Sequence, residues 1–445
     1  MLGGRHALVV LPTGSGKSLC YQLPALALSG EGVTLVFSPL IALMEDQVAA
    51  LKARGIRAEY INSTLDRQER ERRYAALARG EYELIYVTPE RMYKPEFREA
   101  LEGIPGGINL LAVDEAHCIT KWGHDFRPAY KEVGRFRVEL GSPLTIALTA
   151  TATPAVRADI RKTLSLDEKE MPLFASGIDR PNLSFLAVPV WTEDEKVEIV
   201  EQVANAMPGT GIVYFTLIKT LEHVAFELGK RWGSHRVEIY HGKLDPEEKK
   251  RVYERFTASQ PEEQLMLLAT NAFGMGVDKP DIRYIVHYQV PGSVESYYQE
   301  VGRGGRDGKD SRCVLLYEES DLAIQQEFVR WMNPTDDLLR DAAHAFADTD
   351  HAELSIEEVR ELITGRDRGD RRAEYCVIAL EKMGVIEPAP TPEHFRFVRR
   401  LEDGEIDRGD LDAKRERDLR RLLDMVQLVQ CDDIRQYVLD YFELD

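Results

Sequence analysis

The stretch Leu11-Pro-Thr-Gly-Ser-Gly-Lys-Ser18 decides the fold class of this 445-residue chain. It follows the apolar run 6–11 and precedes a helical pattern, so it connects a strand to a helix. Gly14 and Gly16 allow backbone N–H groups to converge on phosphate oxygens at the start of that helix. Lys17 is predicted to reach the β- and γ-phosphates, and Ser18 to bind Mg²⁺. The residues predicted to hold the phosphate chain are Thr13, Gly14, Ser15, Gly16, Lys17 and Ser18.

The general motif has glycine where Leu11 stands, so a Gly/Ser turn with a chance lysine is the alternative interpretation. The organisation around the loop favours phosphate binding. Apolar strand-length runs alternate with helical patterns, as in a parallel sheet that is covered on both faces. The runs of the first block are 6–11, 32–38, 84–87, 110–113 and 145–148, and those of a second block are 211–215, 237–240, 264–269, 282–287 and 312–317.

Two such blocks predict two doubly wound α/β domains, covering residues 1–176 and 177–332, with a boundary near 176–189. Three domains agree with the length of the chain. Residues 333–445 are expected to be mostly helical: helices at 355–364 and 371–383, then strands at 385–386 and 395–398, resemble a winged helix. Two further helices are predicted at 411–429 and 432–441.

Two further segments carry charged groups suited to phosphate chemistry. Asp114-Glu115 follow the apolar run 110–113, so Asp114 is expected to hold Mg²⁺ and Glu115 to polarise an attacking water. Solvated carboxylates are the alternative interpretation. Arg303 and Arg306, three residues apart in the second block, are expected to stabilise negative charge on the γ-phosphate across a cleft. A surface turn is the alternative for this Gly/Arg-rich loop.

These segments, in this order, resemble the RecQ family of superfamily 2 DNA helicases. The resemblance covers residues 8 to about 320. It rests on seven stretches and on the loop Cys118-Ile-Thr-Lys-Trp-Gly-His-Asp-Phe-Arg-Pro128, which is similar to the aromatic-rich loop of that family. The seven stretches are Pro12-Thr-Gly-Ser-Gly-Lys-Ser-Leu-Cys-Tyr-Gln-Leu-Pro24, Ser38-Pro-Leu-Ile-Ala-Leu-Met-Glu-Asp-Gln47, Thr88-Pro-Glu-Arg91, Asp114-Glu-Ala-His117, Leu148-Thr-Ala-Thr-Ala152, Ala269-Thr-Asn-Ala-Phe-Gly-Met-Gly-Val-Asp-Lys-Pro280 and Tyr297-Tyr-Gln-Glu-Val-Gly-Arg-Gly-Gly-Arg-Asp307.

The resemblance implies two RecA-like domains, ATP and Mg²⁺ as cofactors, and 3′-to-5′ movement on single-stranded DNA during recombination and repair. Gln299 is implied to contact the nucleotide. Trp122 and Phe126 are expected to stack on unpaired bases, and His124 and Arg127 to relay DNA occupancy to the nucleotide. From the residues alone, burial of the two aromatic side chains in a core is an equal alternative.

Hydroxyl, amide and cationic groups at strand ends are candidates for gripping the DNA backbone, because such groups contact phosphates without reading sequence. The same residues are common cap and turn formers, so structural roles remain the alternative. The candidates are Ser38, Asn62, Ser63, Thr88, Arg91 and Thr270. Thr149 and Thr151 are expected to link the two domains, or to form a plain turn.

Charge and cysteine usage limit the remaining possibilities. The net charge is −19, and residues 331–445 contribute −12 of it, so a nucleic acid would be held by a local groove. That acidity makes a solvated face the preferred interpretation of Arg371 and Arg372, which the winged-helix pattern offers to DNA. Five separated cysteines and no long apolar run predict reduced thiols in a cytoplasmic protein with no membrane segment.

The two ends of the sequence depart from the family pattern. The family carries an adenine-recognising glutamine upstream, whereas Met1 stands just before the first strand. Residues 422–442 faintly resemble the opening of its zinc module, and the sequence ends before further cysteines, so no zinc is expected. Both ends leave open whether the sequence is a fragment.

The sequence therefore predicts an ATP-dependent DNA helicase acting on single-stranded and forked duplex DNA. The alternatives are an RNA- or duplex-directed superfamily 2 ATPase and a non-catalytic nucleic-acid-binding fragment.

Overall fold

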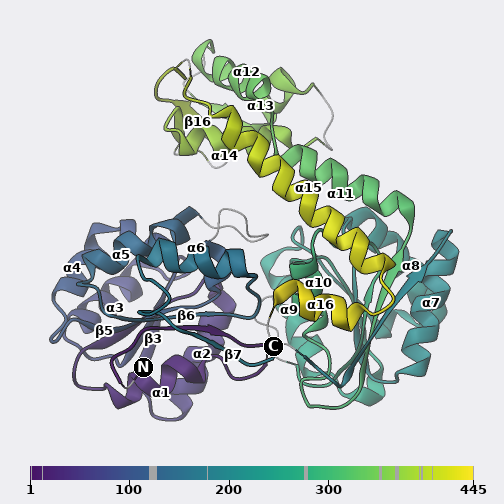
Figure 1. The fold of residues 1–445 in the computed structure, drawn as a ribbon, viewed down its shortest axis with the longest axis horizontal. Coiled ribbons are helices and arrows are strands. Elements are labelled where there is room, and N and C mark those ends of the chain that lie inside the picture. The colour runs from purple at the N-terminus through teal and green to yellow at the C-terminus, as the bar shows by residue number, and fades with distance from the viewer. Residues whose placement is uncertain are drawn as a thin grey trace. The chain divides into compact units, whose positions relative to one another are not determined.

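The computed structural model describes residues 1, 3–12, 14–119, 128–177, 179–274, 279–349, 353–365, 370–389, 391, 394–402 and 404–443. These residues form two compact units, one of Met1–Tyr317 with Leu428–Asp445 and the other of Glu318–Gln427. The first unit contains two α/β lobes, each built on its own sheet, and Figure 1 labels many of the elements of both units.

The first lobe is a seven-stranded parallel sheet in the order β3-β4-β2-β5-β6-β1-β7. Its strands are β1 (Ala7–Val10), β2 (Val33–Phe37), β3 (Ala58–Ile61), β4 (Leu84–Val87), β5 (Ile108–Val113), β6 (Leu144–Thr149) and β7 (Leu173–Ala175). Its helices are α1 (Leu19–Ala27), α2 (Ile41–Ala53), α3 (Arg67–Ala78), α4 (Pro95–Glu102), α5 (Val133–Glu139) and α6 (Pro154–Leu164), with short 3₁₀ turns η1 (Pro89–Tyr93), η2 (Ala116–Ile119) and η3 (Pro128–Glu132).

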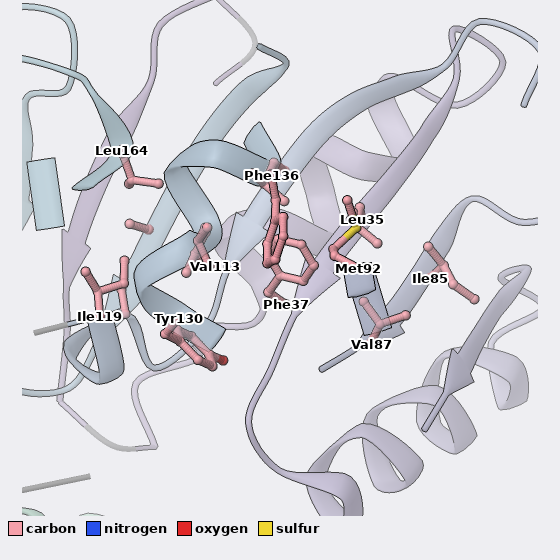
Figure 2. Close-up of a cluster of buried hydrophobic side chains, with 14 of the residues drawn as sticks. Leu35, Phe37, Ile85, Val87, Met92, Val113, Ile119, Tyr130, Phe136 and Leu164 are labelled. Atoms are coloured by element: carbon pink, nitrogen blue, oxygen red, sulfur yellow. The ribbon is translucent and has the colours of Figure 1, made fainter. Parts of the chain in front are cut away.

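The central strands of this sheet are buried on both faces, which explains their mostly apolar sequences. On one face, side chains from β2, β4 and β5 pack against η2, η3 and α5 (Figure 2). Phe37 and Phe136 meet edge to face there, with ring centroids 6.3 Å apart and an interplanar angle of 62°. Because the strands are parallel, their carboxyl ends share one edge of the sheet, and this edge carries the site.

The second lobe is a six-stranded parallel sheet in the order β10-β11-β9-β12-β13-β8. Its strands are β8 (Leu183–Pro189), β9 (Thr210–Tyr214), β10 (Val237–Tyr240), β11 (Met266–Ala269), β12 (Ile282–His287) and β13 (Ser311–Tyr317). Its helices are α7 (Glu193–Ala206), α8 (Ile218–Trp232), α9 (Pro246–Ala258) and α10 (Val294–Val301), with η4 (Ser234–Arg236) and η5 (Pro261–Glu263). Helix α16 (Ile434–Phe442), from the end of the chain, belongs to the same compact unit.

The second unit is mostly helical. It contains α11 (Glu319–Met332), α12 (Asp336–Ala347), α13 (Ile356–Ile363) and α14 (Arg372–Lys382), and most of α15 (Arg408–Gln430). A small antiparallel sheet joins β14 (Leu354–Ser355), β16 (His394–Phe397) and β15 (Ile386–Pro388). The helices α13 and α14 followed by the β15–β16 hairpin agree with the winged-helix pattern read from the sequence.

The predicted fold class is confirmed: two parallel α/β lobes are accompanied by a helical C-terminal region. Four strands were missed, namely β3, β7, β8 and β14, and the predicted boundary segment 176–189 contains β8. Arg372, for which a solvated face was the preferred interpretation, forms an ion pair with the Asp370 carboxylate at 2.5 Å. Within the described parts of the chain, no helix is both long and apolar enough to cross a membrane.

Candidate nucleotide and nucleic-acid site

The loop after β1 has the geometry of a phosphate cradle. Gly14 and Gly16 both have a φ of 82°, a backbone conformation that favours glycine. The Ser15 hydroxyl donates to the Pro12 carbonyl at 2.6 Å, which tightens the turn. The Lys17 ammonium donates to the carbonyls of Leu11 and Pro12 at 3.1 and 3.4 Å. Ser18 directly precedes α1, so the loop opens onto a helix N-terminus.

Lys17 interacts electrostatically with the carboxylates that follow β5. Burial lowers the pKa of its ammonium, whereas the carboxylates of Glu115 and Asp114 act in the opposite direction. Arg306, from the second lobe, lowers it further. Lys17 is therefore close enough to feel both the Asp114-Glu115 carboxylates and the Arg306 guanidinium of the second lobe.

Asp114 lies at the carboxyl end of β5 and is buried, with 7% of its surface exposed. Its N–H donates to the Phe37 carbonyl at 2.8 Å, and its Oδ1 accepts the Glu115 N–H at 3.0 Å. Burial and the adjacent Glu115 carboxylate raise the pKa of Asp114 to about 7. A carboxylate whose charge is disfavoured in this way would be stabilised by a cation, so Asp114 and the Ser18 hydroxyl fit Mg²⁺.

No group of three or more His, Cys, Asp or Glu side chains among the described residues could hold a metal ion. A magnesium ion at Asp114 would therefore depend on phosphate oxygens and water for its remaining ligands, which is how Mg²⁺ is commonly bound.

A relay of hydrogen bonds follows from Glu115 towards the second lobe. His117, buried in η2, places Nδ1 3.0 Å from the Thr149 hydroxyl and 3.3 Å from a Glu115 carboxylate oxygen. The Thr149 hydroxyl donates to the Thr151 carbonyl at 2.9 Å. The Thr151 hydroxyl in turn accepts a hydrogen bond of 3.2 Å from the Gln299 amide on α10. The structure thus places Gln299, predicted at the nucleotide, against Thr151.

The two arginines of the predicted pair differ in their placement. Arg306 lies over the phosphate loop, so that a Cβ added at Gly14 would stand 3.0 Å from Arg306 Cδ. Arg303 is buried in the second lobe and donates to the Gly274 carbonyl. The structure therefore brings Arg306 to the phosphate loop and Lys17, whereas Arg303 binds within the second lobe.

Sequence reasoning assigned no role to Arg180 and Asn182, which stand in the segment 176–189 predicted as the domain boundary. The Arg180 guanidinium donates to the carbonyls of Gly302, Gly304 and Gly305, at 3.3, 2.8 and 2.9 Å. The Asn182 amide donates to the carbonyls of Gly305 and Lys309, both at 2.8 Å. These two side chains hold the backbone that carries Arg306, and the only sequence signal for them was their place in the predicted boundary segment.

His117 is a third residue to which sequence reasoning gave no role, although the motif Asp114-Glu-Ala-His117 contains it. Its function as a link becomes visible only when η2 and the end of β6 are placed side by side.

The predicted DNA-backbone residues lie just beyond the ends of strands. Ser38 follows β2, Asn62 and Ser63 follow β3, Thr88 and Arg91 follow β4, and Thr270 follows β11. Ser63 is exposed and Arg91 is half-buried, so both present polar groups at the surface. Asn62 is buried, and its Oδ1 accepts from the Thr64 N–H and hydroxyl at 3.0 and 2.7 Å, a structural turn.

Ser38 and Thr270 are also buried, with 2% and 7% of their surface exposed, so contact with a nucleic acid would require a change around them. Five predicted residues lie outside the described residues: Thr13, Trp122, His124, Phe126 and Arg127.

Comparison with known proteins agrees with this geometry. Residues 1–160 match the family described as DEAD/DEAH box helicase, and residues 195–308 match the helicase conserved C-terminal domain. The crystal structure of the DUF1998 helicase MrfA bound to DNA and AMPPNP has a TM-score of 0.58 and 19% identity, and the match covers 90% of this chain and 58% of that chain. At this identity the likeness shows the fold.

Two proteins of Bacillus subtilis have closely related sequences. The probable ATP-dependent DNA helicase RecS is 36% identical over the whole of this chain and 84% of its own length. The ATP-dependent DNA helicase RecQ is 46% identical over 72% of this chain, and the match spans about half (52%) of RecQ. The chain belongs to the RecQ family of superfamily 2 ATP-dependent DNA helicases.

Proposed function

We propose that this chain hydrolyses ATP in order to move 3′ to 5′ on single-stranded DNA and to open duplex and forked DNA during recombination and repair. The observation that carries the proposal is the position of Arg306 against Gly14, which joins the second lobe to the phosphate loop of the first. The names of the related RecS and RecQ proteins support the substrate class.

The side chains divide the chemistry of ATP hydrolysis between the two lobes. Lys17 and the loop 14–18 bind the β- and γ-phosphates, while the Glu115 carboxylate accepts a proton from the attacking water. The Arg306 guanidinium stabilises the charge that develops on the transferred phosphoryl group. Ser18 and Asp114 would hold Mg²⁺, which neutralises charge on the phosphate oxygens when it is bound.

The DNA backbone would lie along the ends of β2, β3 and β4, where Ser63, Thr88 and Arg91 stand. Contacts of this kind position a strand without reading its sequence, as a motor requires. The cytoplasm is the proposed location, because the five separated cysteines are free thiols.

The test is ATP hydrolysis with and without a poly(dT) oligonucleotide, together with unwinding of duplexes that carry a 3′ or a 5′ tail. Lys17→Ala should abolish hydrolysis in both conditions. Arg306→Ala should lower kcat by about 10³-fold or more while ATP still binds. Arg251→Ala, on an exposed ion pair of α9, is the matched control and should resemble the wild type.

Hydrolysis by Lys17→Ala at the wild-type rate would contradict the assignment of the site. Stimulation by RNA but not by DNA would contradict the substrate, and preference for the 5′-tailed duplex would contradict the direction.

A further inference from the structure

We propose that helix α16 positions the catalytic arginine loop, with Arg435 and Tyr441 as its two anchors on the second lobe. The inference deepens the proposed function and rests on it. Both side chains contact the second lobe, so both are positioning residues that act through Arg306.

The first anchor holds the segment from which the arginine clamp projects. Arg435, near the start of α16, forms an ion pair with Asp179 and donates to the Leu183 carbonyl. Its guanidinium carbon also lies 5.5 Å from the centroid of the Phe185 ring. Arg435 therefore fixes the chain on both sides of Arg180 and Asn182.

Arg180 and Asn182 transmit this constraint to the loop. Their side chains donate to the backbone carbonyls of Gly302, Gly304, Gly305 and Lys309, which flank Arg306. The loop is glycine-rich and has few side chains of its own with which to pack, so these donors determine its path.

The second anchor holds the helix that leads into the loop. The Tyr441 hydroxyl donates to the Glu295 carboxylate at 2.9 Å, and the Phe442 ring lies 5.4 Å from the Tyr298 ring. Glu295 and Tyr298 belong to α10, which ends one residue before Gly302. The residues Ile434, Val438 and Phe442 form the buried face of α16, which keeps the two anchors at a fixed separation.

A displacement of α16 should change the rate of ATP hydrolysis and not the affinity for ATP. The phosphate loop binds ATP with groups of the first lobe, so a shift of α16 should leave binding largely unchanged. Hydrolysis requires the guanidinium of Arg306 at the γ-phosphate, and an error of about 1 Å in such a group can cost on the order of 10²-fold in rate.

The experiment measures kcat and KM for ATP in the presence of poly(dT), with thermal unfolding of each variant in parallel. Arg435→Ala should lower kcat by about 10- to 100-fold with KM within about twofold. Tyr441→Phe keeps the ring but removes the hydrogen bond, so it should produce a smaller loss of the same kind. Arg435→Lys keeps the charge towards Asp179 and should restore part of kcat. Arg251→Ala serves as the control.

A double-mutant cycle with Arg306 separates the possible outcomes, because residues that act as one unit are not additive. In the Arg306→Ala background, Arg435→Ala should cause no further loss of kcat. Equal losses in both backgrounds, or wild-type kcat for Arg435→Ala and Tyr441→Phe in folded proteins, would overturn the positioning role. Wild-type hydrolysis by Arg306→Ala would instead overturn the proposed function. If Arg435→Ala does not fold, Asp179→Asn tests the same ion pair from its exposed side.

Discussion

At the scale of single residues, the most informative group is the buried carboxyl of Asp114, whose pKa is raised to about 7. Between about pH 4 and pH 7 the folded state keeps a proton that the unfolded chain has released. The free energy of unfolding therefore falls as the pH rises through this window. Asp114→Asn removes the free-energy cost of burying an ionised carboxylate. The nucleotide-free variant should therefore melt at least about 2 °C above the wild type at pH 8.

The difference in melting temperature should shrink as the pH falls and vanish near pH 4. Asp307 provides a control of the opposite sign: burial raises the pKa of its carboxyl, but hydrogen bonds from Arg283 outweigh this and lower it. Asp307→Asn should accordingly destabilise the protein at neutral pH. Equal melting temperatures for Asp114→Asn and the wild type at pH 8 would contradict the prediction.

At the scale of elements, the segment after β6 joins the carboxylate loop to α10. Thr151→Val removes the hydroxyl that accepts the Gln299 amide, without changing the size of the side chain. We expect ATP hydrolysis to remain within about threefold and unwinding to fall by about tenfold, since the contact that connects the lobes is lost while the hydrolytic groups stay. The ratio of base pairs opened to ATP hydrolysed measures this coupling.

Gln299→Leu breaks the same hydrogen bond from the other lobe and should have the same effect, with the double variant no worse than either single one. A large rise in the KM for ATP with Gln299→Leu alone would instead favour the nucleotide contact predicted from the sequence.

The strands that sequence reasoning missed have a common position. β3 and β7 are the two edges of the first sheet, β8 is an edge of the second and β14 is an edge of the small antiparallel sheet. The criterion used was an apolar run, which suits strands covered on both sides, whereas β8 alternates between exposed and buried positions and β3 contains Glu59. Every interior strand was therefore predicted, whereas of the edge strands only β10 and β15 were.

The same distinction applies to the site. The phosphate loop and Asp114-Glu115 are local sequence patterns, so they could be predicted. The hydrogen bonds from His117 to Thr149 and from Arg180 to Gly304 join residues that are 32 and 124 positions apart in the sequence. No local sequence pattern predicts partners at such separations.

At the scale of the whole molecule, the net charge of −19 requires DNA binding to depend on a few local cations. Arg91→Ala should weaken binding of single-stranded DNA and reduce the slope of log affinity against log salt concentration by about 0.7. Fluorescence anisotropy over a salt series measures the slope. Arg79→Ala, at the far end of α3 in an exposed ion pair with Glu81, is the control and should leave the slope unchanged. Equal slopes for all three proteins would place the DNA elsewhere.

The strand order of the first sheet also sets a length. β1, which leads to Lys17, and β4, which leads to Arg91, are four strand spacings apart, about 19 Å along a continuously hydrogen-bonded edge. Because this edge is rigid, the ends of β1 and β4 cannot approach each other during a turnover. The length of each step along the DNA must then be set by movement of the second lobe, while the first lobe keeps its internal dimensions.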